Sequence, residues 1–372
     1  MLQEHLGYLA DAPRLDKFRR AIAAVLRPGD VVADLGCGSG ILGLLALQSG
    51  AAHVYAIDDS AMLHVARETL ERAGLAQRAT FIQGRSQQVL LPARVDVVLC
   101  DHVGYFGFDY GIVELLADAR HRFLKPGGTI LPARIALQLA AVESAAARRF
   151  TEGWRDAGVP PEFHWLRAHA VNAKHDIGLR PQDLLSSPVS PGTLELAAEV
   201  PPYLSWQGEL RIERDGLVHG LAGWFDCELA AGVAMSNSPL APDRIDRSQA
   251  FLPIDEPVPV ARGDLLKATL MLRPADVVIG WSVQSPDGGR RQSHSTWQGM
   301  PLAPEDLQRA HPARVPLPGS EARARSIVLG YCDGRRTASE VRDAVAREHP
   351  GLLPSAAELE RFVAQVLARD TH

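Results

Sequence analysis

Three glycines separated by single residues, Gly36, Gly38 and Gly40, follow a short apolar segment near the start of the chain. Glycine lets a backbone turn sharply and approach a ligand closely, because it has no Cβ. Asp34 lies two residues before the first glycine, and Asp58 ends the next apolar segment, where a carboxylate can accept hydrogen bonds from both hydroxyl groups of a ribose. Together they predict a site for a nucleoside-containing cofactor. The glycines alone would not distinguish it from the pyrophosphate-binding turns of nicotinamide and flavin enzymes.

The scaffold that holds these residues is predicted from short β-branched segments that alternate with longer helical ones between residues 30 and 140. This alternation is typical of a parallel α/β sheet. The predicted strands are residues 31–35, 54–57, 80–83, 95–99 and 128–131.

A different pattern follows, in which candidate strands are punctuated by proline and glycine and indicate an antiparallel barrel or sandwich. These strands are residues 135–142, 208–213, 233–235 and 265–272. The proline-rich residues 301–318 predict a linker. Beyond it, Thr337 with Glu340 and Ser355 with Glu358 each place a hydroxyl group at a helix N-cap and a glutamate three residues later, which predicts two helices.

The composition is that of a soluble globular enzyme, with 46% apolar and 22% charged residues in a chain of 372. The longest apolar run, residues 41–47, is far too short to span a membrane, and the N-terminus has no signal-peptide pattern, so we expect a cytoplasmic protein with no membrane partner. The net charge is −5 and no basic stripe occurs, which argues against nucleic-acid binding. The four cysteines are scattered, so neither a disulfide framework nor a metal site is predicted.

The spacing Asp-x-Gly-x-Gly-x-Gly resembles that of class I methyltransferases, which implies S-adenosylmethionine as the cofactor. Between Tyr8 and Trp281 several stretches resemble the protein arginine methyltransferases in order and spacing. The resemblance implies that Arg14 grips the cofactor carboxylate, for which a guanidinium is well suited; the alternative is a surface arginine on an amphipathic helix. It also implies that Ser86 borders the adenine, although the family usually has an acidic residue where Gln87 or Gln88 stands.

The acceptor side departs from that family. Residues 95–106 and 124–132 resemble its active-site hairpin and following strand, in which two glutamates hold the substrate guanidinium. Asp101 replaces the first glutamate and His102 the tryptophan beside it, while Tyr110, preceded by Asp109, stands at the second. In the facing loop, aligned on Gln249, residues 245–247 (Ile-Asp-Arg) replace a Thr-His-Trp tripeptide. We therefore expect the reaction to be kept and the acceptor changed, although loss of activity would leave the same pattern.

Methyl transfer is an in-line displacement, so catalysis depends largely on holding the acceptor aligned. We expect Asp101 to orient the acceptor, and His102, with Asp246 across the cleft, to accept its proton. Asp101 and His102 are adjacent at a strand end, so they need not reach the same acceptor. The alternative to a functional role for His102 is a histidine packed in a loop. For Tyr105 the alternative is a core aromatic residue.

The segment from Arg325 to Val341, with the helix after it, resembles the small winged-helix domains of the PqqD type, which bind leader peptides. A stabilising C-terminal cap or a dimer contact would fit the same pattern. The predicted organisation is α/β: a Rossmann-like class I methyltransferase domain (residues 1–134), a β-barrel acceptor and dimerisation domain (135–301) and a winged-helix-like domain (319–372). The family resemblance also implies a homodimer through an arm that includes Phe163 and Trp165.

The predicted function is methylation of a side-chain nitrogen or oxygen of a peptide or protein, with a leader peptide delivering a ribosomally made substrate. Two alternatives remain at this point: methylation of a small natural product, and a catalytically silent protein that binds peptides.

Overall fold

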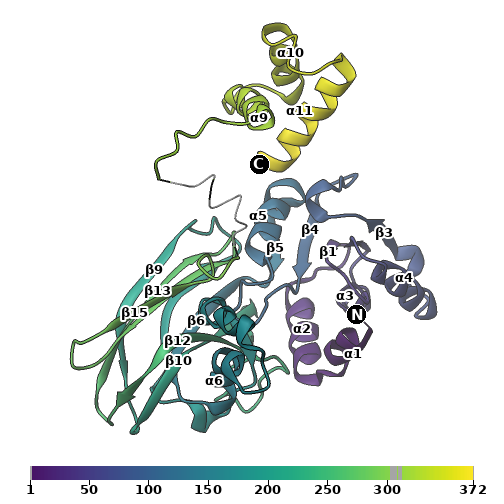
Figure 1. Ribbon diagram of the computed structural model, residues 1–372. Coiled ribbons are helices and arrows are strands. Elements are labelled where there is room, and N and C mark those ends of the chain that lie inside the picture. Colours follow the sequence, from purple (N-terminus) through teal and green to yellow (C-terminus); the bar gives the residue numbers. More distant parts are fainter. Residues whose placement is uncertain (1, 302–307, 309–311, 372) are drawn as a thin grey trace. The chain divides into compact units, whose positions relative to one another are not determined.

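The computed structural model describes residues 2–301, 308 and 312–371. The chain forms two compact units, Met1–Pro301 and Leu302–His372. The larger unit contains one parallel and two antiparallel sheets (Figure 1). Among the described residues, no helix combines the length and the hydropathy that crossing a bilayer requires.

The parallel sheet has five strands in the order β3-β2-β1-β4-β5. They are β1 (Val31–Leu35), β2 (His53–Asp58), β3 (Ala79–Gln83), β4 (Val95–Cys100) and β5 (Leu124–Leu131). All four neighbouring pairs are parallel, and Asp34 lies opposite Ala56 while Asp58 lies opposite Gln83. The prediction of a Rossmann-like parallel sheet is confirmed, with the fifth strand beginning earlier than the sequence suggested.

Helices connect these strands and precede the first of them. They are α1 (Leu2–Ala10), α2 (Ala12–Val25), α3 (Ile41–Gln48), α4 (Met62–Arg72) and α5 (Ile112–Arg122), with the short 3-10 helices η1 (Ala76–Arg78) and η2 (Ser86–Gln88). The carboxylate of Asp11 begins α2 by accepting a hydrogen bond from the backbone N–H of Arg14 at 3.1 Å. The apolar face of α2 buries Phe18, Ala21 and Ile22. Gly40, with φ of 80°, begins α3 directly after the glycine run.

Ten further strands form the two antiparallel sheets of the larger unit. They are β6 (Arg134–Val142), β7 (His175–Ile177), β8 (Val189–Glu195), β9 (Leu204–Arg211), β10 (Gly216–Ala230), β11 (Val233–Ser236), β12 (Gln249–Val260), β13 (Leu265–Arg273), β14 (Val278–Gln284) and β15 (Arg291–Ser295). One sheet has the order β7-β12-β10-β6-β8, with β11 paired to β10, and the other has the order β15-β14-β13-β9. Antiparallel pairing is confirmed. An isolated bridge between Ser186 and Ile212 links the sheets at one edge, and closure into a full barrel stays a prediction.

The predicted dimerisation arm lies in an insertion between β6 and β7. This insertion consists of α6 (Ala145–Glu152), η3 (Gly153–Arg155), η4 (Pro161–Leu166) and α7 (Arg167–Val171), and η5 (Pro181–Asp183) follows β7. The aromatic side chains of Phe163 and Trp165 in η4 are exposed.

In the described residues of the smaller unit, the structure has the helices α9 (Ser320–Gly330), α10 (Ala338–Glu348) and α11 (Ala356–Asp370). Its own apolar core consists of Val328, Val341, Val345, Leu359, Val363 and Val366. Both predicted helix starts are confirmed: Thr337 and Glu340 form a reciprocal capping box, and Ser355 caps α11 through the N–H of Glu358. Residues 308 and 312–371 contain no strand, so the winged-helix resemblance stays a prediction.

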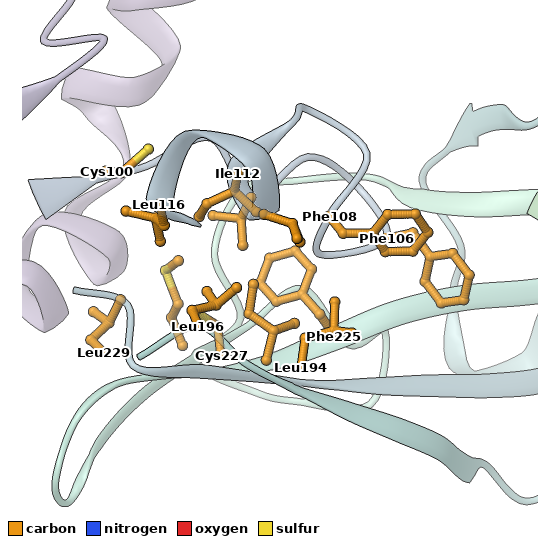
Figure 2. Packing of buried hydrophobic residues seen from close by; sticks show 14 of the residues in the cluster. Cys100, Phe106, Phe108, Ile112, Leu116, Leu194, Leu196, Phe225, Cys227 and Leu229 are labelled. Carbon is orange, nitrogen blue, oxygen red and sulfur yellow. The ribbon is translucent and has the colours of Figure 1, made fainter. Parts of the chain in front are cut away.

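The loop after β4, residues 101–110, packs directly on the antiparallel sheet through buried aromatic side chains. Figure 2 shows side chains of this loop and of α5 facing those of β8, β10 and the residue after β8. Glycines allow the close approach. A Cβ on Gly107 would lie 2.7 Å from Ile135 Cγ2, and one on Gly223 would lie 2.6 Å from the ring of Phe106. The antiparallel sheet therefore fixes the loop that carries the candidate acceptor residues.

This packing predicts unequal effects at two loop glycines. Gly107 has φ of 88° and its missing Cβ faces Ile135 and Phe225, whereas Gly111 has φ of 79° and open space beside it. Gly107→Ala should lower the free energy of unfolding by about 2–4 kcal/mol, through backbone strain and overpacking together. Gly111→Ala should cost only the strain, about 1–2 kcal/mol. Denaturant unfolding of both variants measures the difference, and equal effects would contradict this account of the loop.

Candidate active site

The glycine run turns immediately after β1, at the carboxyl edge of the parallel sheet. Gly36, Gly38 and Gly40 have φ of 60°, 52° and 80°, a region that favours glycine. The ring of His102 lies against Gly36, and the ring of His5, from α1, lies against Gly38, so a Cβ at either glycine would collide with an imidazole. The run thus brings α1 and the loop after β4 together at one place.

Two buried carboxylates hold the backbone around this turn. Asp58 Oδ2 accepts the N–H of Gly38 at 2.8 Å, and its Oδ1 accepts both the N–H and the hydroxyl of Ser60 at 2.8 and 2.6 Å. Asp34 Oδ2 accepts the N–H of Gly43 at 2.9 Å, inside the first turn of α3. Burial raises the pKa of Asp34 to about 7; the hydrogen bond from Gly43 acts in the opposite direction, and the nearby charge of Asp58 adds to the rise. Both residues lie at the strand ends that the sequence predicted.

Arg14 and Asp101 form a buried ion pair between α2 and the end of β4. Arg14 also donates from Nη1 to the backbone carbonyl of Tyr8 at 3.3 Å, and its guanidinium lies 4.9 Å from the centre of the Tyr8 ring. Burial, and next the charge of Arg247, lower the pKa of Arg14 to about 10, so it stays protonated at neutral pH. Arg14 Nε and Asp101 Oδ1 are buried without a hydrogen-bond partner among the described residues. Each therefore keeps one unsatisfied position at the site.

His102 separates from Asp101 and faces the glycine run. Its Nδ1 lies 3.3 Å from Cys100 Sγ, and its ring packs against Gly36. Burial lowers the pKa of His102; Asp58 acts in the opposite direction and Arg247 adds to the decrease. The imidazole is therefore neutral at physiological pH and able to accept a proton. The packing of the ring against Gly36 also matches the alternative of a packed loop histidine. His102 combines this packing with the ability to accept a proton.

Asp109, which precedes the residue at the position of the second glutamate, is held inside the loop by two partners. Its Oδ1 accepts the N–H of Phe106 at 2.8 Å, and its Oδ2 pairs with Lys174 Nζ at 2.6 Å. Lys174 also lies 4.9 Å from the centre of the half-buried Tyr105 ring. Tyr110 is exposed and meets Tyr105 edge to face at 5.6 Å. The carboxylate of Asp109 is therefore neutralised by the chain itself.

In the loop before β12, the side chain of Arg247, and not that of Asp246, points at the loop after β4. The Arg247 guanidinium donates from Nη1 to the carbonyl of Gly104 at 3.0 Å and lies 5.4 Å from the centre of the Tyr8 ring. Asp246 is exposed, and its backbone N–H donates to Asp11 Oδ2 at 2.8 Å. The backbone hydrogen bond to Asp11 fixes this part of the loop, and the side chain that contacts residues 101–110 is that of Arg247. A proton-accepting role for Asp246 stays a prediction.

Ser86 is buried at the start of η2, and its hydroxyl donates to Gln87 Oε1 at 3.4 Å. The carbonyl of Ser86 accepts from Arg122 Nη2 at 2.5 Å, which anchors the segment to α5. Adenine contact by Ser86 stays a prediction. No cluster of three or more metal-ligating side chains occurs in the described part of the chain.

Four residues at the site were not predicted from the sequence: His5, Tyr8, Lys174 and Arg247. His5 and Tyr8 lie three residues apart in α1 with ring centres 6.1 Å apart, a spacing that places them on one helix face and could have indicated a shared surface. Arg247 stands where the resembling family has tryptophan, and the change was weighed only as a loss. Nothing in the local sequence marks Lys174, because it reaches Asp109 from 65 residues away.

Known proteins resemble this chain in sequence and in fold. Residues 32–128 match the family described as a methyltransferase domain. Protein arginine N-methyltransferase 1 of Dictyostelium discoideum is 27% identical over 280 residues, which cover 73% of this chain and 82% of that protein. Protein arginine N-methyltransferase 2 of Homo sapiens is 28% identical over 308 residues, covering 76% and 71%.

Two solved structures share the fold. The Trypanosoma brucei PRMT1 enzyme-prozyme heterotetrameric complex with AdoHcy has a TM-score of 0.68 at 19% identity, covering 78% of this chain and 97% of that one. Arabidopsis thaliana protein arginine methyltransferase 10 has a TM-score of 0.69 at 21% identity, covering 80% and 98%. The chain is an S-adenosylmethionine-dependent methyltransferase that is similar to the protein arginine methyltransferases.

The raised pKa of Asp34 predicts a pH-dependent gain from neutralising it. A buried carboxyl with a folded-state pKa near 7 destabilises the fold increasingly as pH rises from its ordinary value of 3.8 towards 7. Asp34→Asn keeps an oxygen for the N–H of Gly43, so it should raise the melting temperature of the ligand-free protein. The gain in the free energy of unfolding at about pH 8 should exceed the gain at about pH 5 by roughly 2–3 kcal/mol at most.

Asp96→Asn is the matched control, since it should do the opposite. Burial raises the pKa of Asp96, but the hydrogen bonds from Lys125 and Val31 outweigh it, and the net pKa is lowered. Its charge therefore stabilises the fold above the unfolded-state pKa, and that contribution is lost as pH falls. Asp96→Asn should lower the melting temperature at about pH 8. A loss of stability for Asp34→Asn that grows with pH would contradict the account of Asp34.

Proposed function

We propose that this methyltransferase transfers the methyl group of S-adenosylmethionine to a side-chain nitrogen or oxygen of a peptide or protein. One observation carries the proposal: the ring of His102, in the loop after β4, lies directly against Gly36 of the glycine run. A cofactor held at the glycines would therefore meet its acceptor at residues 101–110. The similarity to enzymes named protein arginine N-methyltransferases supports a protein or peptide acceptor.

The side chains at the carboxyl edge of the sheet fit the parts of this cofactor. Asp58 supplies a buried carboxylate for the ribose hydroxyls, and the glycine run leaves its backbone open to close approach. Arg14 has a buried Nε without a partner, so its guanidinium can bind the carboxylate of the methionine tail. Ser86 borders the adenine in this proposal. The cofactor supplies an electrophilic methyl group on a sulfonium.

The chain contributes alignment and proton management on the acceptor side. The loop after β4 is fixed by its packing on β6 and β10, which keeps the acceptor in line with the methyl group. His102, neutral at physiological pH because its pKa is lowered by burial, accepts the proton of a nitrogen or hydroxyl acceptor. The unpaired Oδ1 of Asp101 accepts a hydrogen bond that orients the acceptor.

We propose two further roles, one for the smaller helical unit and one for the insertion between β6 and β7. The helical unit Leu302–His372, with its own core and capped helices, binds the leader segment of a peptide substrate. The insertion between β6 and β7 forms a homodimer arm, supported by the exposure of Phe163 and Trp165. Methylation of a small natural product would not need affinity for peptides, and a catalytically silent protein would show no turnover, so these two measurements separate the alternatives.

Cofactor binding tests the first part of the proposal. Calorimetric titration should show micromolar binding of S-adenosylmethionine and S-adenosylhomocysteine and none of NAD. Asp58→Ala should weaken binding of the adenosyl ligands by about tenfold or more, because a charge-assisted hydrogen-bond acceptor is lost. Asp96→Ala, near the opposite edge of the same sheet, is the control and should bind like the unchanged protein. No adenosyl binding, or equal loss in both variants, would contradict the cofactor site.

Sedimentation tests the dimer. The unchanged protein should sediment as a dimer, and Phe163→Ala with Trp165→Ala should shift it to monomer by removing exposed aromatic contact area. Trp297→Ala is the control, because Trp297 is as exposed as Trp165 but lies outside the insertion. A monomeric unchanged protein, or a dimer insensitive to the double substitution, would rule out this arm as the dimer contact.

A further inference from the structure

The half-buried guanidinium of Arg247 adds a positive charge to the acceptor side. Among the described residues it forms no ion pair within 4 Å, and it contacts the carbonyl of Gly104 and the face of Tyr8. Its charge nevertheless acts on the site, because it lowers the pKa of both Arg14 and His102. The neighbouring Asp246 is not among the groups that shift those two pKa values. The loop before β12 therefore presents a positive charge, that of Arg247, to the loop after β4.

In the ligand-free chain, each carboxylate that could hold a cation is already paired with a cation of the chain. Asp101 pairs with Arg14, and Asp109, whose side chain is 0% exposed, pairs with Lys174 at 2.6 Å. A guanidinium or ammonium acceptor would have to displace one of these cations and approach Arg247 as well. Arg247 would repel a positively charged acceptor, and solvent screens the repulsion between half-buried charges less than that between exposed ones.

Two guanidinium groups flank the ring of Tyr8. Arg14 lies 4.9 Å and Arg247 lies 5.4 Å from the ring centre. Arg14 projects from α2 and reaches the end of β4, whereas Arg247 projects from the loop before β12 and reaches the carbonyl of Gly104 inside residues 101–110. In the proposed function Arg14 binds the carboxylate of the cofactor tail. Arg247 is then left for a second anion on the acceptor side.

We propose that Arg247 binds a carboxylate of the acceptor and that this carboxylate receives the methyl group, giving a methyl ester. The inference rests on the cofactor site and the methyl transfer of the proposed function. It specifies the acceptor as an acidic side chain or terminus of a peptide, and for such an acceptor the proton-accepting role of His102 and the hydrogen bond to Asp101 Oδ1 are not needed. A carboxylate oxygen forms the new bond to the methyl carbon while the carbon–sulfur bond breaks, and that electron pair goes to sulfur. S-adenosylhomocysteine and the ester are the products, and no proton is transferred. Arg247 orients the attacking group by paired hydrogen bonds.

Binding to the full chain saturated with S-adenosylhomocysteine tests the recognition. The probes are the capped tripeptides acetyl-Gly-Glu-Gly-amide, acetyl-Gly-Gln-Gly-amide and acetyl-Gly-Arg-Gly-amide. The glutamate peptide should bind about tenfold tighter than the glutamine peptide, and the arginine peptide should bind more weakly than both. Arg247→Gln should abolish the preference and Arg247→Lys should keep part of it. Arg244→Gln, which removes an exposed arginine of the same loop, should leave it unchanged.

Tighter binding of the arginine peptide, a preference that survives Arg247→Gln, or no measurable binding of all three peptides would overturn the proposal. Transfer is tested with S-adenosylmethionine labelled in the methyl group. Label on the glutamate peptide should be released as methanol by alkali, as an ester requires. Alkali-stable label on the arginine or glutamine peptide, or no label on a bound glutamate peptide, would overturn ester formation. Failure of the proposed function is distinguishable, because S-adenosylhomocysteine would then not bind before any peptide is added.

Discussion

Arg14 and Asp101 lie buried together, and their opposite charges connect α2 to the end of β4. Removing one partner of a buried pair leaves an uncompensated charge and typically costs about 3–5 kcal/mol, so neither side chain can move without another group taking its place. The pair stands at the meeting point of the two halves of the site. The glycine run and Asp58 lie at the carboxyl ends of β1 and β2, and the loop after β4 carries Asp101 and accepts a hydrogen bond from Arg247. The remaining charges of the site are arranged around this constraint.

The chain satisfies that constraint by distributing charge across distant segments. Lys174, from the segment before β7, neutralises Asp109, and Asp11 holds the backbone of Asp246 so that Arg247 faces Gly104. The antiparallel sheet contributes shape, since Gly107 and Gly223 let the loop aromatics rest directly on β6 and β10. A scaffold shared with arginine methyltransferases can thus present a different electrostatic environment to its acceptor without a change in fold.

Much of this could be predicted from the sequence where the signal is local. The strand ending before Gly36, the strand ending at Asp58 and the helix starts at Thr337 and Ser355 are set by neighbouring residues, and the structure places them as expected. The long strands β10 and β12 were missed, because their buried runs contain glycine and proline that indicated breaks.

The site was predicted less completely, for a physical reason. Which residue of the loop 245–247 faces the hairpin depends on a hydrogen bond from Asp246 to Asp11, 235 residues away. The partner of Asp101 likewise depends on how α2 packs against the sheet. Such long-range choices leave no periodic trace in the sequence. The strand ends that carry Asp34 and Asp58 could be placed from local signals, whereas the acceptor side could be described only as a set of departures from a resemblance.

A crystal structure of the full chain with S-adenosylhomocysteine would test the central claim most directly. The account predicts that the ribose hydroxyls lie within hydrogen-bond distance of the Asp58 carboxylate. It also predicts the tail carboxylate on Arg14 and the sulfur facing residues 101–110. A ligand bound elsewhere would contradict it. So would a ligand bound at this edge while the Asp58 carboxylate stays hydrogen-bonded to Gly38 without contacting the ribose, and with no contact between the tail and Arg14.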